Sequence, residues 1–166
     1  MFRKIFNPDF LSQKKRENLA ATLLIFIFFL LSFVSVVRGY ALTTDEDKHY
    51  LYGEKILLGD SNRFNPSTMP VTALNALPRR ISTFISNERI SYLLEKYALA
   101  RMITVFFSGI VAFFVFHWSR TLFGFVPALF SLIFYLFDPN IIAHSQLVTT
   151  DIYMTGALVC TFYFLW

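Results

Sequence analysis

Charged residues are scarce in this chain of 166 residues: only 16% are Asp, Glu, Lys or Arg, whereas 55% are hydrophobic and 19% aromatic. A soluble domain of this size carries far more charge. Phenylalanine occurs 21 times, largely inside uninterrupted apolar runs, which is more apolar surface than one small water-exposed fold can bury. The composition therefore predicts an all-α, polytopic membrane protein whose apolar runs face lipid or other helices.

Cysteine is nearly absent as well. The single one, Cys160, lies within an apolar run, so an intrachain disulfide is excluded and a packing role is expected. The formal net charge is +4, but no basic stripe with stacking aromatic residues stands apart from the apolar runs. We therefore expect no nucleic-acid partner and assign the excess of cations to membrane topology and lipid headgroup contact.

Four apolar segments are candidate transmembrane helices, because a helix of about 20 residues spans the hydrocarbon core of roughly 30 Å. The predicted spans are residues 19–37, 97–118, 121–137 and 152–166. The predicted connections are the N-terminus 1–18, a long loop 38–96 with juxtamembrane helices, a turn 119–120 and a second loop 138–151. The fourth span ends at Trp166 with too few residues to cross a bilayer, so we expect a truncated chain.

Orientation is predicted from basic residues beside the spans. Before the first span these are Arg3, Lys4, Lys14, Lys15 and Arg16, and in the second turn Arg120. The positive-inside rule then makes the N-terminus and this turn cytoplasmic and both loops non-cytoplasmic. A cleaved signal peptide with a site at Gly39 and Ala41 is the alternative for the first span, but its apolar region is too long.

The segment after the first span reads as a capped helix between Thr43 and Gly59. Thr43 and Glu46 fit a capping box, and Gly59 can end the helix in a left-handed conformation. Helical geometry places Glu46 and Asp47 on the side of Tyr50 and the leucines, which is the side expected to pack inward. The acids are either ordinary caps or carboxylates of a site, where one of them can act as a general base.

Two further features of the sequence bear on this site. Asp45 and His49 form an i, i+4 pair on a neighbouring side, and with Asp47 or His144 they are an alternative chelate for a divalent metal. Arg101 lies a few residues inside the second span, where a guanidinium either binds a lipid phosphate bidentately or anchors the helix by snorkelling.

The second loop offers more polar groups. Asp138 can cap a short helix that begins at Pro139, and Thr149 or Thr150 can cap the fourth span. If spans two and three form a hairpin, His144 and Asp151 lie on the same side of the membrane as the acidic helix. Groups from two loops would then meet at one membrane face.

Motifs in both loops and beside the second span resemble, in order and spacing, the bacterial protein mannosyltransferase-like glycosyltransferases (family 39), which have the GT-C fold. The motifs are Asp45-Glu46, His49, Gly53, Leu57-Leu58, Gly59-Asp60, Phe64-Asn65-Pro66, Pro70, Leu74 to Pro78, Ala100-Arg101, Trp118-Ser119-Arg120, Leu122-Phe123-Gly124, Asp138 to Ser145 and Thr149-Thr150-Asp151. The resemblance covers roughly residues 19–166.

The resemblance implies a GT-C-like N-terminal part of an inverting enzyme in the bacterial plasma membrane. Such an enzyme moves a sugar from a polyprenyl-phosphate donor to an acceptor hydroxyl of a protein, lipid or glycan on the non-cytoplasmic side. Asp45 would be the base and Glu46 its partner in the acidic motif; Arg101 would bind the donor phosphate. Supporting roles fall to His49, His144 and Asp151.

The resemblance also implies that no cofactor or catalytic metal is needed. Because family members are several hundred residues long, we expect this chain alone to be inactive. The alternative is a noncatalytic membrane component, either a transporter fragment or an assembly partner, in which the acids only cap helices and Arg101 only anchors one.

Overall fold

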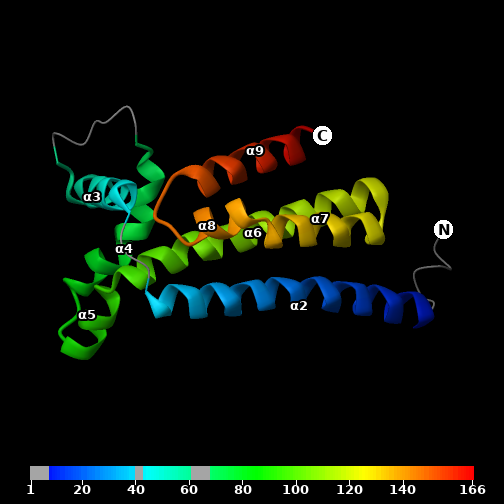
Figure 1. Cartoon of the computed structure of the whole chain (residues 1–166), viewed down its shortest axis with the longest axis horizontal. Helices are drawn as coiled ribbons and strands as arrows, with labels where there is room; N and C mark the ends of the chain where they lie inside the picture. The colour runs from blue at the N-terminus through cyan, green and yellow to red at the C-terminus, as the bar shows by residue number, and fades with distance from the viewer. Residues whose placement is uncertain (1–7, 40–42, 61–67) are drawn as a thin grey trace.

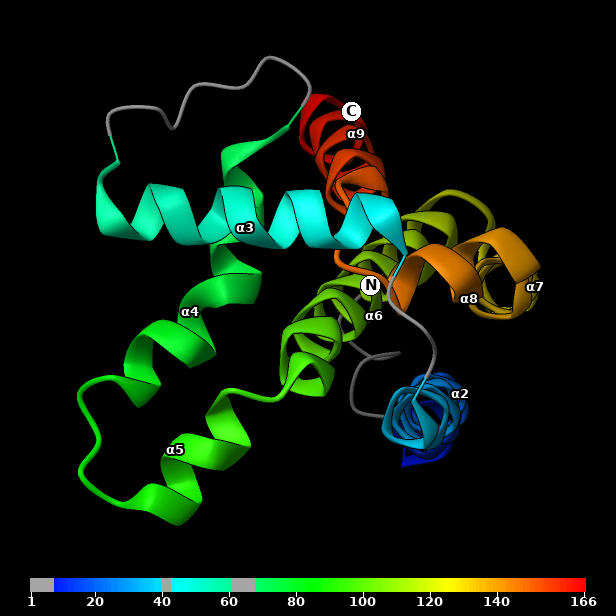
Figure 2. The ribbon, with the colours of Figure 1, turned by 60° about the vertical axis from the view of Figure 1, so that its left-hand side comes forward.

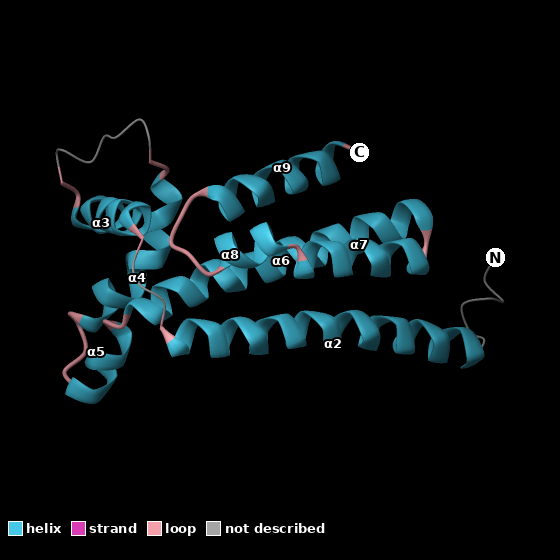
Figure 3. Cartoon of the chain, viewed as in Figure 1, coloured by secondary structure: helices cyan, strands magenta, loops and turns pink. Residues whose placement is uncertain are grey.

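A computed structural model describes residues 8–39, 43–60 and 68–166, with side chains from residue 15 onward. Arg3, Lys4, Ala41 and the Phe64-Asn65-Pro66 motif lie outside the described residues. Within them all regular structure is helical (Figure 3), as the composition predicts. The elements are α2 (Pro8–Arg38), α3 (Thr44–Leu58), the 3-10 helix η1 (Pro70–Thr72), α4 (Ala73–Ser82), α5 (Glu88–Leu94), α6 (Tyr97–Phe123), α7 (Phe125–Phe137), α8 (Pro139–Ser145) and α9 (Asp151–Leu165).

The long helices run side by side, and α3, α4 and α5 gather at one end of them (Figure 1). Two helices are long and apolar enough to cross a membrane, α2 over Lys15–Arg38 and α6 over Tyr97–Phe123. A third candidate exists if α7 and α8, which meet at a bend of 58°, count as one span. The helix α9 is apolar but shorter. The chain therefore has two or three candidate spans, and the four predicted ones are confirmed only in part.

The turn between the second and third predicted spans lies four residues later than expected. The prediction placed it at Ser119 and Arg120, but α6 continues through both to Phe123, and the chain turns at Gly124 with φ +89°. Both polar side chains find partners on other helices, Ser119 on Ser131 and Arg120 on Glu17 and Asn18. They therefore need no exposed turn, whereas a positive φ favours glycine.

This shift shortens the third predicted span. The helix α7 has only 13 residues, about 20 Å at 1.5 Å per residue, which is less than a hydrocarbon core. The predicted hairpin is confirmed, because α7 folds back and packs against α6. The predicted cap of α8 is also confirmed: Asp138 accepts from the backbone amides of Asn140 and Ile141, and Pro139 begins the helix.

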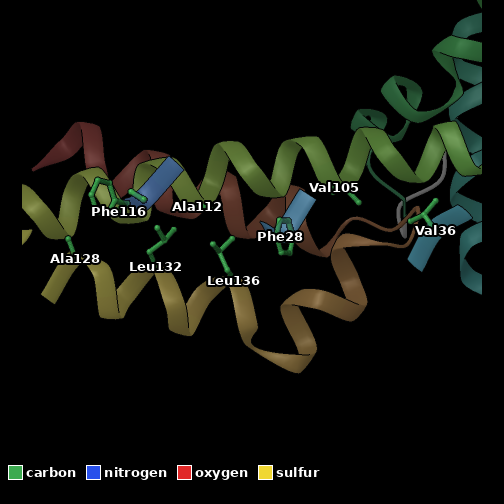
Figure 4. Close-up of a cluster of buried hydrophobic side chains, with 9 residues drawn as sticks. Phe28, Val36, Val105, Ala112, Phe116, Ala128, Leu132 and Leu136 are labelled. Carbon is green, nitrogen blue, oxygen red and sulfur yellow. The ribbon is translucent and has the colours of Figure 1, made fainter. Parts of the chain in front are cut away.

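The main core lies where α2, α6 and α7 meet (Figure 4). Val105 and Ala112 of α6 face Ala128, Leu132 and Leu136 of α7, and all five side chains are buried. Three residues of α2, Ala21, Phe28 and Val36, and Phe116 of α6 complete this cluster. Small residues at such contacts let helix backbones approach closely, which is how helices associate in a membrane.

A second, more polar core joins α4 to the long helices through Asn75. Its amide nitrogen donates to the Ala100 carbonyl at 2.8 Å and to Thr104 Oγ1 at 2.9 Å, both on α6. Its oxygen accepts from the Tyr153 hydroxyl of α9 at 2.8 Å. Asn75 is fully buried, so this one side chain ties three helices together.

We expect Asn75→Ala to lower the free energy of unfolding by about 1–3 kcal/mol, because it removes three buried hydrogen bonds, to Ala100, Thr104 and Tyr153. Asn140→Ala on the exposed face of α8 is the matched control, with an expected change within about 0.5 kcal/mol. Denaturation of the detergent-solubilised protein measures both. Equal midpoints for the two variants would contradict the role of Asn75.

Candidate functional site

The candidate site is centred on an ion pair between Glu46 of α3 and Arg101 of α6. Arg101 Nε donates to Glu46 Oε1 at 2.9 Å and Arg101 Nη2 donates to Oε2 at 2.7 Å. Both side chains are buried, with 0% of Glu46 and 4% of Arg101 exposed. This bidentate geometry is the strong form of an arginine–carboxylate interaction.

Two backbone amides complete the hydrogen bonds of the Glu46 carboxylate. Val148 N, in the connection between α8 and α9, donates to Oε1 at 3.0 Å. Thr43 N donates to Oε2 at 3.3 Å, while Thr43 Oγ1 accepts from Glu46 N. The predicted capping box is therefore confirmed. Each carboxylate oxygen accepts two hydrogen bonds, which is what a buried carboxylate requires.

This network brings together the two loops that the sequence pointed to. The Val148 contact joins the second loop to α3, and Arg101 joins both to α6. Figure 2 shows α3 crossing the end of the bundle beside α8 and the start of α9. The two loops therefore meet through the backbone amide of Val148, whereas His144 and Asp151, the residues expected to meet the acidic helix, pair with each other.

Aromatic rings pack around the pair. The Tyr97 ring lies 4.7 Å from that of Tyr50, and the Arg101 guanidinium lies 5.7 Å from the Tyr97 centroid. Desolvation raises the pKa of the Tyr50 hydroxyl above its usual range, and the Glu54 carboxylate adds to this effect. Tyr50 therefore stays neutral, and its ring packs on the Tyr97 ring that lies beside the guanidinium.

Asp45 has a different environment from its neighbour. Its side chain is 76% exposed, and it forms an ion pair with Lys48 Nζ at 3.5 Å, one turn further along α3. Asp47 is also exposed, so the prediction that it shares the inward side with Glu46 is wrong. The buried side of α3 consists of Glu46, Tyr50, Tyr52 and Gly53. Asp45 is thus an accessible carboxylate, and the buried Glu46 beside it holds this end of α3 in place.

The supporting residues fall into two groups. His144 Nδ1 lies 3.0 Å from Asp151 Oδ2, which pairs these two predicted residues across the connection from α8 to α9. His49 lies one turn after Glu46 on α3, half-buried. In the described part of the chain, five buried side-chain atoms have no hydrogen-bond partner: His49 Nδ1, Tyr97 Oη, Trp118 Nε1, His144 Nδ1 and Thr149 Oγ1. Three of them, on His49, Tyr97 and Thr149, lie within about one helical turn, along the chain, of a member of the network, whereas Trp118 lies toward the other end of α6.

The alternative of a metal chelate gains nothing from the geometry. The described residues contain no group of three or more His, Cys, Asp or Glu side chains that could hold a metal ion. Asp45 forms its ion pair with Lys48 instead.

No protein-family model, curated protein or solved structure matches this chain. The assignment of a function therefore depends on the geometry of the network and on the chemistry of its side chains.

Sequence reasoning missed two members of the network. The Val148 amide is a backbone group, and no residue type marks its position. The sequence pattern marks Tyr97 only as the first residue of a span, although an aromatic residue one turn before a buried arginine fits a ring that covers the guanidinium. Asn75 was also missed, since an asparagine within a polar loop has no signal of burial.

Proposed function

We propose that this chain belongs to an inverting glycosyltransferase of the GT-C type, which moves a sugar from a polyprenyl-phosphate donor to an acceptor hydroxyl. The observation that carries the proposal is the contrast between adjacent carboxylates. Asp45 is accessible, whereas Glu46 is locked by Arg101 and two backbone amides. A base that must meet a substrate needs access and a fixed position, and this arrangement offers both.

In the proposed reaction Asp45 accepts the proton of the acceptor hydroxyl as the hydroxyl oxygen attacks the anomeric carbon of the donor. The bond from that carbon to the phosphate oxygen breaks at the same time, and the polyprenyl phosphate leaves with the bonding electrons. One displacement inverts the anomeric centre. Glu46 is a positioning residue in this scheme, because it acts on Asp45 through the backbone of α3.

The polar atoms around the network support a substrate site. His49 Nδ1, Tyr97 Oη and Thr149 Oγ1 lack partners among the described residues, and buried polar atoms of this kind call for an explanation. Hydroxyls of a sugar or an acceptor can supply the missing hydrogen bonds. The His144–Asp151 pair gives a second polar cluster on the connection that carries Val148.

Arg101 has two partners in this scheme, Glu46 and the donor phosphate. Its guanidinium already binds Glu46 through Nε and Nη2, so a donor phosphate has to share it. We propose that the phosphate approaches this pair from the side of the α8–α9 connection. The network then helps to orient the donor without being taken apart.

For topology, we propose that the start of α2 and the turn at Gly124 face the cytoplasm and that the Glu46 network lies at the other membrane face of the bacterial plasma membrane. The Arg120–Glu17 contact at 2.6 Å supports a common side for the first two. Basic residues before α2 and at Arg120 then satisfy the positive-inside rule.

The experiment that tests the function is sugar transfer by the protein expressed from its complete gene and reconstituted in bilayers. It is offered polyprenyl-phosphate sugars and a membrane extract that contains acceptors. We expect release of polyprenyl phosphate together with a product of inverted anomeric configuration. A product of retained configuration, or no release from any donor, would overturn the proposal.

A noncatalytic membrane component is the second candidate, and one observation favours it. Glu46 and Arg101 neutralise each other inside the fold, which is also how a purely structural pair behaves. Under this alternative the start of α3 only covers the end of the helix bundle. Asp45 would then tolerate substitution without any change in the activity of the membranes that contain the protein.

A further inference from the structure

The helices α4 and α5 expose an apolar surface that the bundle does not use. Its members are large side chains between 47% and 75% exposed: Ile81, Phe84, Ile90, Tyr92 and Leu93. The helix α5 has no buried residue at all, and the helix it packs against is α4. We call these five residues the α4–α5 surface. A helix with so little support in its own chain is stabilised by whatever covers its apolar side chains.

Basic residues accompany this surface. The Arg80 guanidinium lies 5.3 Å from the Phe84 centroid, and Lys96 Nζ lies 5.0 Å from the Tyr92 centroid. Arg89 is exposed in the first turn of α5. Over residues 73–96 there are four basic and two acidic side chains. Apolar side chains with cations beside aromatic rings are typical of elements that lie in a membrane interface.

The short connection from α5 to α6 fixes the depth of the α4–α5 surface relative to the spans. Lys96 is the N-cap of α6, the longer candidate span, and it follows α5 by one residue. Figures 1 and 2 show α4 and α5 at the end of the bundle where α2 ends and α6 begins, and to the side of the long helices. If α6 crosses the bilayer, α5 therefore lies where α6 enters it.

The remaining charges of this region do not compete with that arrangement. Arg79 is paired with Glu54 of α3 at 2.9 Å. Glu95 accepts hydrogen bonds from the Ser82 and Ser91 hydroxyls. Glu88 lies in the first turn of α5, where the helix dipole favours it.

We propose that the α4–α5 surface lies in the headgroup region beside the spans and binds anionic phospholipids through Arg80, Arg89 and Lys96. The apolar side chains enter the acyl boundary, and the three cations contact lipid phosphates. This proposal rests on α6 crossing the membrane and not on glycosyl transfer. Its failure would leave the proposed function untouched, and the reverse also holds.

The test uses the full chain in lipid nanodiscs, which leave both membrane faces accessible. In a Cys160→Ser background, Leu93→Cys carries an environment-sensitive fluorophore, and Lys55→Cys on exposed α3 carries it as the positional control. Nanodiscs contain phosphatidylcholine either alone or with phosphatidylglycerol. We expect lipids with a quencher near the headgroup to quench the Leu93 position but not the Lys55 position, and more strongly when phosphatidylglycerol is present.

The charge variants separate the two parts of the proposal. R80Q/R89Q/K96Q should remove the phosphatidylglycerol-dependent increase in quenching at the Leu93 position. Each lost cation should lower the population of the α4–α5 surface that is bound to lipid by about fivefold. K48Q/K55Q on α3 is the matched control and should change nothing. If the triple variant unfolds, R89Q alone tests the same point, since this side chain lies on the exposed α5.

Three results would overturn the proposal. An aqueous quencher that reaches the Leu93 position in both lipid mixtures places the surface in water. A lipid contact of equal strength in both mixtures, unchanged by the charge variants, removes the role of anionic lipid. Protection without lipid quenching, dependent on protein concentration, shows that a second copy covers the surface.

Discussion

Asp45→Asn is expected to reduce sugar transfer by about 10²- to 10⁴-fold, the usual contribution of a general base. The substitution keeps the shape of the side chain but removes its ability to accept the hydroxyl proton. Stability should change by less than about 0.5 kcal/mol, because the side chain is 76% exposed and its ion pair with Lys48 is a surface pair. The measurement is the transfer rate of the reconstituted protein from its complete gene, beside its unfolding midpoint.

Asp47→Asn is the matched control for this prediction. Asp47 lies in the same first turn of α3 and is also exposed, so the two variants change the charge of the helix equally. A large loss of rate for Asp45 alone assigns the base. Equal losses in both variants would reduce the effect to the local charge and would count against Asp45.

Glu46→Gln is expected to lower the free energy of unfolding by about 3–5 kcal/mol, the cost of leaving a buried charge without its partner. The amide that replaces the carboxylate turns a donor toward Arg101 or toward the amides of Val148 and Thr43, which are donors themselves. Arg101 then remains a buried cation with no counter-charge from Glu46. Denaturation in detergent, followed by tryptophan fluorescence, measures the loss.

A matched control lies on the same helix. Glu54→Gln breaks the pair with Arg79, whose side chains are 24% and 53% exposed, and we expect a cost below about 1 kcal/mol. The double variant E46L/R101M should be more stable than E46Q, because removing both charges avoids the uncompensated one. If the stability losses of E46L and R101M, each measured singly, added up to the loss of E46L/R101M, the pair would not be coupled as the geometry requires.

Local sequence signals predicted both ends of α3 and the start of α8 correctly, whereas the predicted threonine cap of the fourth span is wrong, because Thr150 makes no side-chain cap hydrogen bond and Thr149 Oγ1 has no partner. Thr43 with Glu46, Gly59 at the end of α3, and Asp138 with Pro139 are all short-range motifs, and each occurs as expected. Such motifs depend on atoms within a few residues, so one sequence contains what is needed to predict them.

The turn after α6 and the burial of single side chains could not be predicted in the same way. The local sequence predicts a turn at Arg120. Its partner Glu17 lies about a hundred residues earlier in the chain, so no local pattern indicates their contact. Glu46 and Asp47 looked equivalent, and only the approach of α6 and Val148 makes one buried and leaves the other exposed. Tertiary contacts decide these cases.

The most direct measurement of the account is photoaffinity labelling with a polyprenyl-phosphate sugar that carries a diazirine on the sugar, followed by mass spectrometry of the labelled peptides. We expect labels in two segments, around Asp45 in α3 and between His144 and Asp151, since the network joins these segments. Unlabelled donor should compete for both. Labels confined to the lipid-facing side of α2, or labels that unlabelled donor does not displace, would contradict a donor site at the Glu46 network.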